Sequence, residues 1–208
     1  MGLKISGRSK ISPFIVMDVM RSANAREATG DDVLHLEVGQ PSTSAPKSVI
    51  EAAKLALDDH SLGYTDALGI PLLKQHLAQY YKACYDIKVS SDCIVVTTGS
   101  SGAFLLSFLA VFETGDKVAI TSPSYPAYKN ILRALGIEVI EIQVGADTSF
   151  QLNTEILDSI KENLEGLIIA SPSNPTGTML SDSSLKEICE WCSKKKVRLI
   201  SDEIYHGI

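Results

Sequence analysis

Three polar side chains near the end of the chain lie within four residues of the end of an apolar run. Asp202 follows the run at residues 197–201, and Tyr205 comes three positions later. Asn174 follows the run at residues 167–170, inside the segment Ser-Pro-Ser-Asn-Pro-Thr-Gly. A carboxylate at the end of a buried strand is costly without a cationic partner, so Asp202 predicts a positively charged ligand atom or an arginine beside it. The same residues also suit a helix N-cap and an ordinary proline turn.

Two earlier segments offer complementary chemistry. Residues 99–102, Gly-Ser-Ser-Gly, run from a predicted strand straight into a predicted helix. The first amides of a helix have no intrahelical acceptor, so this junction can bind a phosphate, although a tight turn with serine caps explains it equally well. Tyr125, between Ser124 and Pro126, can stack on a planar ring or simply pack at a strand end.

Together, these loops offer a phosphate cradle, a stacking ring, a contact for a phenol oxygen and a carboxylate for a protonated ring nitrogen. That set matches pyridoxal phosphate. A carboxylate that keeps the pyridine nitrogen protonated makes the ring an electron sink for a carbanion at the substrate α-carbon. Ligands of open α/β sheets bind outside the carboxyl ends of the strands, so the loops can converge on one ligand. The sequence therefore predicts a site for this cofactor.

The elements that must position these loops alternate along the chain. Short apolar and β-branched runs predict strands at residues 93–98, 117–121, 137–142, 167–170 and 197–201. Apolar residues at helical spacing predict helices at residues 14–28, 47–58, 70–85, 101–112, 127–135, 154–163 and 181–195. The strands are apolar on both faces, as parallel strands covered by helices are. This alternation predicts an α/β architecture with a largely parallel sheet.

Composition narrows the class of protein. The 208 residues are 45% hydrophobic and 21% charged with a net charge of −6, which indicates a globular protein and argues against a nucleic-acid partner. The longest uncharged run, residues 94–112, contains turn residues at its middle, and the amino terminus has no signal-peptide pattern. We therefore expect no membrane partner and a cytoplasmic protein.

The four cysteines include one C-x-x-C pair, Cys189 and Cys192. Such a pair is compatible with a redox dithiol or half of a zinc site. Leu185, Ile188 and both cysteines repeat at helical spacing, and no second pair or nearby histidine completes a tetrahedral set. We therefore interpret these thiols as small apolar core residues and expect no metal site.

The chain resembles fold type I pyridoxal-phosphate enzymes, and among them class I/II aminotransferases of the aspartate aminotransferase family. The resemblance runs from about residue 11 to residue 208. Its most specific part is the segment at 171–177 followed, after one helix and one strand, by Ser-Asp-Glu-Ile-Tyr at 201–205. Residues 39–41, 64–69 and 123–128 are also similar to the family's pattern. The resemblance implies a three-layer α/β/α large domain with a mostly parallel sheet, incomplete in this chain.

The resemblance also implies roles for the matching residues. Those implied to bind the cofactor are Ser100, Ser101, Gly102, Tyr125, Asn174, Asp202, Tyr205 and Tyr64. The first three would hold the phosphate, Tyr125 would stack on the ring, and Asp202 would pair with the ring nitrogen. Asn174 and Tyr205 would contact the ring hydroxyl oxygen, and Gly39 and Asn174 would lie against the substrate. Tyr64 would reach the phosphate of the neighbouring subunit, which implies a homodimer with shared active sites.

In the family that this chain resembles, the Schiff-base lysine lies beyond the motif aspartate, in a Ser-x-x-Lys-type segment. The chain ends at Ile208, so we expect no catalytic residue of that kind in it. We interpret residues 1–45 as an amino-terminal arm and the start of a small domain, and residues 46–208 as the amino-terminal part of a large cofactor-binding domain. The isolated chain is predicted neither to fold natively nor to transaminate, and a cooperative thermal transition with measurable turnover would refute this.

Several functions stay open from the sequence. Amino-group transfer from an amino acid to a 2-oxo acid is the first. A carbon–sulfur lyase or a synthase on the same scaffold shares these cofactor motifs, and a non-catalytic, truncated protein of this fold is a further alternative. A nucleotide-binding domain is disfavoured because both G-x-G-x-x-G and a Walker lysine are missing. The sequence does not rank aspartate, aromatic, alanine or branched-chain donors, and family prevalence alone favours a dicarboxylate or a broad range.

Overall fold

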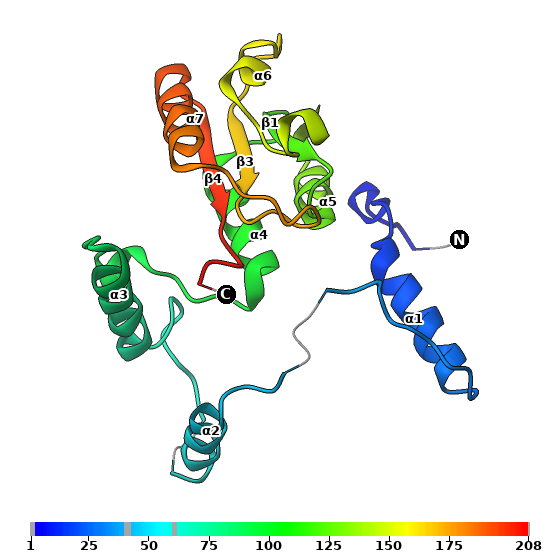
Figure 1. Cartoon of the computed structure of the whole chain (residues 1–208), viewed down its shortest axis with the longest axis vertical. Helices are drawn as coiled ribbons and strands as arrows, with labels where there is room; N and C mark the ends of the chain where they lie inside the picture. The colour runs from blue at the N-terminus through cyan, green and yellow to red at the C-terminus, as the bar shows by residue number, and fades with distance from the viewer. Residues whose placement is uncertain (1–2, 40–42, 60–61, 208) are drawn as a thin grey trace. The chain divides into compact units, whose positions relative to one another are not determined.

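The computed structural model describes residues 3–39, 43–59 and 62–207 (Figure 1). The chain divides into two compact units, one made of Met1–Phe14 with Thr98–Ile208 and the other of Ile15–Thr97. Each unit is described by itself below.

A four-stranded sheet lies at the centre of the first unit. Its strands are β1 (Lys117–Ser122), β2 (Glu138–Gln143), β3 (Gly166–Ala170) and β4 (Arg198–Asp202), in the spatial order β2-β1-β3-β4. All three pairings are parallel, and the β3–β4 register ends with Ala170 opposite Asp202. These strands match four predicted ones to within about a residue. Because all are parallel, their carboxyl ends, and the loops that follow them, meet at one edge of the sheet.

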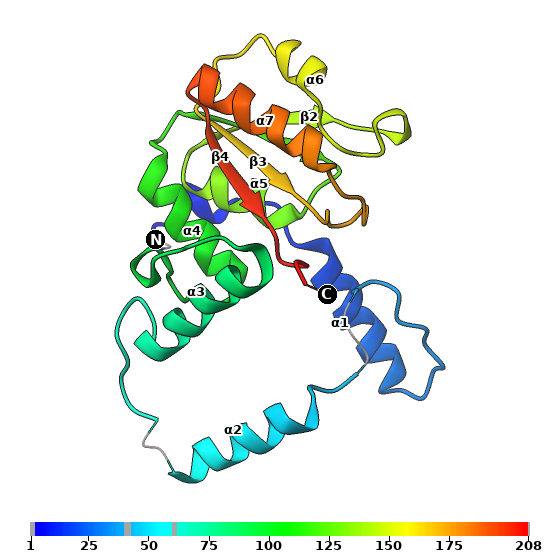
Figure 2. The same cartoon turned by 60° about the vertical axis from the view of Figure 1, so that its left-hand side comes forward.

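Helices cover both faces of this sheet and make three layers (Figure 2). The unit contains α4 (Gly99–Val111), α5 (Pro126–Ala134), α6 (Thr154–Asp158) and α7 (Asp182–Lys195), with the short turns η1 (Gly7–Ser9) and η3 (Ala146–Thr148). Along β1, Ala119 joins a buried cluster with α6 and α7, whereas Val118 and Ile120 join a second cluster with α4 and α5. This alternation is the period-two pattern of a strand buried on both sides. The predicted α/β fold with a parallel sheet is confirmed.

The expected strand at residues 93–98 is wrong. That segment contains the end of the turn η2 (Ser91–Cys93) and then backbone that joins no sheet in the described part of the chain. Its main chain pairs instead with a turn, since the N–H of Val96 donates to the carbonyl of Leu68 at 3.1 Å. β-branched residues favour a strand, but a strand forms only where a neighbouring ladder receives its N–H and C=O groups.

Helix α6 is shorter than the predicted 154–163. Asn153 caps its start, because its side chain accepts from the N–H of Ile156 at 2.9 Å. At its end the hydroxyl of Ser159 donates to the carbonyl of Ile156 at 2.7 Å, and the N–H of Ile160 donates to the carbonyl of Leu157 at 3.3 Å. The helical ladder therefore closes there, and residues from 160 on form a loop.

The second unit contains α1 (Ile15–Glu27), α2 (Lys47–Asp59), α3 (Pro71–Tyr85) and η2. Within it, Gly69 has φ of +104°, and a Cβ there would lie 2.5 Å from Cγ2 of Val96, so only glycine suits this turn. No described residue between 15 and 97 is buried. None of the described helices anywhere in the chain is long and apolar enough to cross a bilayer. The division at residues 45 and 46 stays a prediction.

Candidate active site

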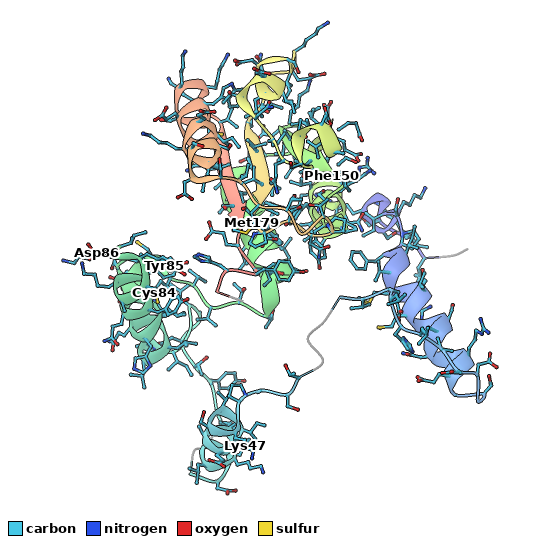
Figure 3. All side chains as sticks on the ribbon, in the orientation of Figure 1. Lys47, Cys84, Tyr85, Asp86, Phe150 and Met179 are labelled. Carbon is cyan, nitrogen blue, oxygen red and sulfur yellow. The ribbon has the colours of Figure 1, made fainter. Side chains whose placement is uncertain are left out.

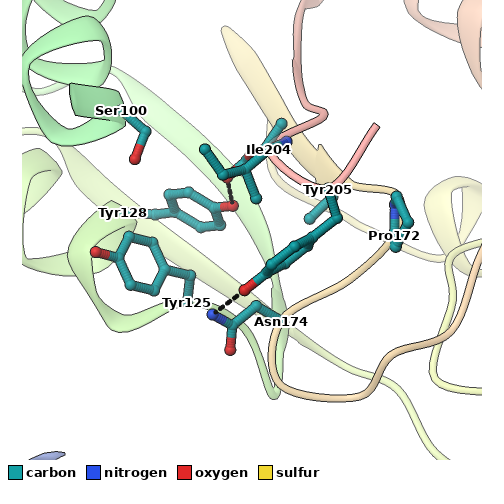
Figure 4. A pocket seen from close by; sticks show the side chains of 9 residues that line it. Ser100, Tyr125, Tyr128, Pro172, Asn174, Ile204 and Tyr205 are labelled. Atoms are coloured by element: carbon teal, nitrogen blue, oxygen red, sulfur yellow. Dashed lines mark hydrogen bonds between the residues drawn. The ribbon is translucent and has the colours of Figure 1, made fainter. Parts of the chain in front are cut away.

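A pocket opens at the carboxyl edge of the sheet, next to the first turn of α4 (Figure 4). It encloses about 160 Å³. Its lining comprises Ser100, Tyr125, Tyr128, Ala170, Pro172, Asn174, Asp202, Ile204 and Tyr205. Five of the residues that the sequence singled out therefore lie together, although more than a hundred positions separate Ser100 from Tyr205.

Asp202 ends β4 with a buried carboxylate, 8% exposed. One oxygen, Oδ1, accepts from the N–H of Ile204 at 3.0 Å, and the other, Oδ2, accepts from the hydroxyl of Tyr128. No ion pair to Asp202 occurs within the described residues. A carboxylate oxygen has two lone pairs, so each oxygen can accept one bond more. Asp202 is thus fixed in orientation and faces a pocket in which a ligand cation would compensate its charge.

Tyr128 is the site residue that the sequence analysis missed. It lies on α5, is 2% exposed, and packs edge-on against Phe104 with ring centroids 5.0 Å apart. Burial, and then the hydrogen bond to Asp202, raises the pKa of its hydroxyl, which therefore stays a protonated donor. One signal was available in the sequence: α5 begins at Pro126, so Tyr125 and Tyr128 are separated by nearly one helical turn and lie on the same side.

Tyr125 precedes α5, in the extended conformation (φ −63°, ψ 120°) that the following proline favours. Its half-buried ring meets Tyr128 edge-on at 5.5 Å and Phe14 edge-on at 5.9 Å. These contacts hold the ring as one wall of the pocket, where a planar ligand can stack on it.

Asn174 belongs to the Asn174 loop, residues 171–180, which connects β3 to α7. Its amide Nδ2 donates to the hydroxyl oxygen of Tyr205 at 3.2 Å (Figure 4). The peptide bond between Asn174 and Pro175 is cis. The first residue of the loop is hydrogen-bonded to β4, because the N–H of Ser171 donates to the carbonyl of Asp202 at 3.1 Å. An amide and a phenol, the side chains that would contact a ring oxygen, are therefore paired next to Asp202.

The first turn of α4 lies at the remaining side of the pocket. Ser100 lines the cavity, whereas Ser101 and Gly102 follow it in the same turn without lining it. Thr98 at the N-cap makes no capping bond with its side chain in the described structure. Amides of a first helical turn have no acceptor within the helix, so this end suits an anion.

The chain matches the family model described as aminotransferase class I and II over residues 31–208. The chain belongs to this family. The pocket of this aminotransferase-family chain thus combines a fixed buried carboxylate, a stacking ring, an amide–phenol pair and a helix amino terminus.

Its relatives in the family include proteins of known name. It is 49% identical over 205 residues to valine–pyruvate aminotransferase of Mycobacterium tuberculosis, an alignment that covers 99% of this chain and 53% of the relative. A crystal structure of an aminotransferase from Mycobacterium tuberculosis is similar with a TM-score of 0.95 and 48% identity, covering 100% of this chain and 54% of that one. Aspartate aminotransferase from Thermus thermophilus, solved with maleate, has a TM-score of 0.92 and 27% identity, with coverage of 98% and 54%. The chain spans about half the length of these relatives.

Besides Ser101 and Gly102, two further predicted residues of this family chain are not among those lining the pocket. Gly39 and Tyr64 belong to the unit of Ile15–Thr97, and both are exposed. Gln40 and Pro41, which carry part of the family pattern, lie outside the described residues.

The C-x-x-C pair of α7 divides between core and surface. Cys192 is 3% exposed in the buried cluster that contains Ala119, Leu157 and Ile188, called here the α6–α7 cluster. Burial raises the pKa of its thiol to about 11. Cys189 is exposed, so its interpretation as a core residue is wrong. No group of potential metal ligands is found among the described residues.

Proposed function

We propose that the protein is an aminotransferase that uses pyridoxal phosphate to move an amino group from an amino acid to a 2-oxo acid. Family membership supports the reaction class. The observation that carries the proposal is the carboxylate of Asp202, buried, held by two hydrogen bonds and directed at a pocket walled by Tyr125.

The residues of the pocket fit this cofactor. Asp202 lacks a cationic partner among the described residues, and a pyridinium N–H would supply one. The amide of Asn174 and the hydroxyl of Tyr205 suit the ring hydroxyl oxygen, and the first turn of α4 suits the phosphate. When bound, the cofactor supplies an electron sink for the carbanion formed at the substrate α-carbon.

The chain's own groups orient that chemistry. The Asp202 carboxylate would keep a proton on the ring nitrogen, and Tyr128 would hold the carboxylate in place through the Oδ2 hydrogen bond. Tyr125 would cover one ring face and exclude water from it. Ser100, Ser101 and Gly102 would bind the phosphate.

The relatives, and the predicted residues outside the pocket, support proposals for the substrates and the assembly. A relative at 49% identity is named valine–pyruvate aminotransferase, so we propose valine and pyruvate as the first donor and acceptor to test. Gly39 would lie against the substrate. The exposed Tyr64 would reach the phosphate of a second subunit, which makes the working unit a homodimer. We further propose a cytoplasmic location.

The test uses the full-length protein with pyridoxal phosphate, valine and pyruvate. We expect alanine and the 2-oxo acid of valine as products. Asp202→Asn should lower kcat by about 10²–10³-fold, the usual cost of removing one preorganised electrostatic group. Asp147→Asn, at an exposed position of η3, should leave kcat unchanged. Ammonia and pyruvate formed from a donor with a β-leaving group, without transfer, would indicate a lyase instead. Full activity of Asp202→Asn would contradict the proposed role of this carboxylate.

A further inference from the structure

A buried glutamine outside the pocket holds the Asn174 loop. Gln151 is 9% exposed, and its amide Nε2 donates to the carbonyl of Thr178 at 2.9 Å and to the Oγ1 of Thr178 at 3.0 Å. It lies between η3 and α6 and does not line the pocket. Burying a primary amide is unfavourable unless its hydrogen bonds are made, so both acceptors on Thr178 matter.

The loop by itself has a fixed shape. The N–H of Ser173 donates to the carbonyl of Thr178 at 2.9 Å, and the N–H of Gly177 donates to the carbonyl of Ser173 at 2.8 Å. These bonds close a tight turn around Asn174 and Pro175, with Gly177 at φ of +68°. They set the turn's conformation, but they do not set where the turn lies over the sheet.

Two contacts fix the loop to the rest of the unit: the Ser171 N–H bond to the Asp202 carbonyl holds its start on β4, and Gln151 holds its far end on the core. The residue before it, Phe150, packs against the α6–α7 cluster, and the residue after it, Leu152, is 2% exposed within that cluster. Figure 3 marks Phe150 and Met179, the chain neighbours of Gln151 and Thr178. The Thr178 carbonyl accepts from both Gln151 and Ser173, and Ser173 directly precedes Asn174. A short chain of hydrogen bonds thus links the core to the residue that contacts Tyr205.

We propose that Gln151 is a positioning residue for the active site, which sets the placement of Asn174 through the Thr178 carbonyl. The effect of Gln151 on binding of the cofactor's ring oxygen rests on the proposed function. Its structural part, the placement of the loop, stands without the cofactor.

The first test uses the full-length protein without cofactor. Gln151→Met keeps the volume of the side chain and removes both hydrogen bonds to Thr178. Amide hydrogen exchange at Ser173 and Gly177 should therefore accelerate by at least about tenfold, since the loss of one hydrogen bond of ordinary net strength already has about that effect. Gln143→Met is the matched control, since Gln143 is exposed at the end of β2. Unchanged exchange at both amides in Gln151→Met would overturn the proposal, whatever the protein catalyses.

The second test measures binding of pyridoxal phosphate in a double-mutant cycle. Gln151→Met alone should weaken binding about tenfold and move the absorption band of the bound cofactor in the direction that Asn174→Ala moves it. In the Asn174→Ala background the same change should add almost nothing, because its effect passes through Asn174. A purely structural glutamine would give additive losses and an unshifted band, and that result would overturn the proposal. If the unmodified protein binds no cofactor, the proposed function fails, while the exchange test still decides the role of Gln151.

Thr178→Val refines the route. It removes the Oγ1 that accepts from Gln151 at 3.0 Å and that also hydrogen-bonds the Oγ1 of Thr176 at 2.9 Å, but it keeps the carbonyl that Gln151 and Ser173 share. Thr176→Val alone measures the effect of losing the Thr176 contact, which is subtracted. Its effect on exchange should therefore be smaller than that of Gln151→Met. An equal or larger effect would place the coupling on the threonine side chain and contradict the carbonyl route.

Discussion

The two compact units of the chain bury their apolar side chains to very different extents. The unit with the sheet holds two buried clusters, one on each face of β1 and β3. In the unit of Ile15–Thr97 no described residue is buried, and Leu34 and Leu36 are 86% and 90% exposed. The pocket lies wholly on the unit with the core. A site needs side chains held by packing on several sides, and only this unit supplies that from within itself.

The second unit shows what helices alone provide. Its three helices close their hydrogen bonds within their own segments, but α1 and α3 contain no buried residue, so these two helices lack the packing that gives most helices their stability. Exposed apolar surface of this kind is typical of interaction sites. We therefore expect the roles of Gly39 and Tyr64 to depend on what covers this unit.

The largest expected effect is on the rate of amino transfer. It tests whether Tyr64 of one subunit completes the site that contains Asp202 of another. If Tyr64 completes a neighbour's site, Asp202→Asn and Tyr64→Phe should each be strongly impaired alone. Mixed after joint refolding, the full-length variants should recover about a quarter of the unmodified activity, because half of the random dimers carry one intact site. The measurement is amino transfer before and after mixing. Absence of recovery, with dimers present by size, would place Tyr64 outside the shared site.

A pair of leucine truncations measures the difference in packing directly. Leu157 is 1% exposed in the α6–α7 cluster, so Leu157→Ala should lower the free energy of unfolding by about 3–4 kcal/mol. Leu57 on α2 is 64% exposed, and Leu57→Ala should cost less than about 0.5 kcal/mol. Urea unfolding of the full-length protein, followed by far-ultraviolet circular dichroism, measures both variants. Equal costs at the two positions would mean that α2 is buried in the working protein.

Removing one hydroxyl in each unit sharpens the comparison further. Tyr128→Phe removes the donor to the buried carboxylate of Asp202 and should cost about 1.5–3 kcal/mol of stability, with an activity loss of about tenfold. Tyr80 on α3 is exposed, and its hydroxyl meets that of Tyr85 at 3.4 Å, so Tyr80→Phe should change neither quantity measurably. Thermal unfolding and steady-state kinetics check both variants. Unaltered kinetics in Tyr128→Phe would show that the hydrogen bond from Tyr128 is not required to hold the Asp202 carboxylate in its active position.

The smallest expected effect is a pH dependence in the second unit. The hydrogen bond that the His35 ring donates to the Glu37 carboxylate raises the pKa of His35 above its ordinary value of 6.5, with a smaller contribution from Glu27. Because the folded value is the higher one, the contribution of this group to stability is full below 6.5 and is lost as pH rises through the raised value. His35→Gln should remove the fall in stability that this group causes at pH values above 6.5. Thermal unfolding at a series of pH values checks it, and identical profiles would exclude His35 as the source.

The amino-acid sequence by itself determined the order of the elements and the identity of most pocket residues. Four of the strands and the helices, apart from the end of α6, follow from local periodicity and caps, which act within a few residues of the chain. Ser100, Tyr125, Asn174, Asp202 and Tyr205 were found because each follows or ends an element at the carboxyl edge. Their roles stay proposals, as do those of Ser101, Gly102, Gly39 and Tyr64.

Only the tertiary structure decided which residues support the pocket and which apolar run joins the sheet. Tyr128 reaches Asp202 across 74 positions of sequence, and Gln151 reaches Thr178 across 27, so neither contact leaves a local pattern. The run at 93–98 has strand-forming residues but no ladder beside it in the described structure. Propensity and periodicity are properties of one segment, whereas strand pairing and side-chain hydrogen bonds need a partner that folding must bring to the same place.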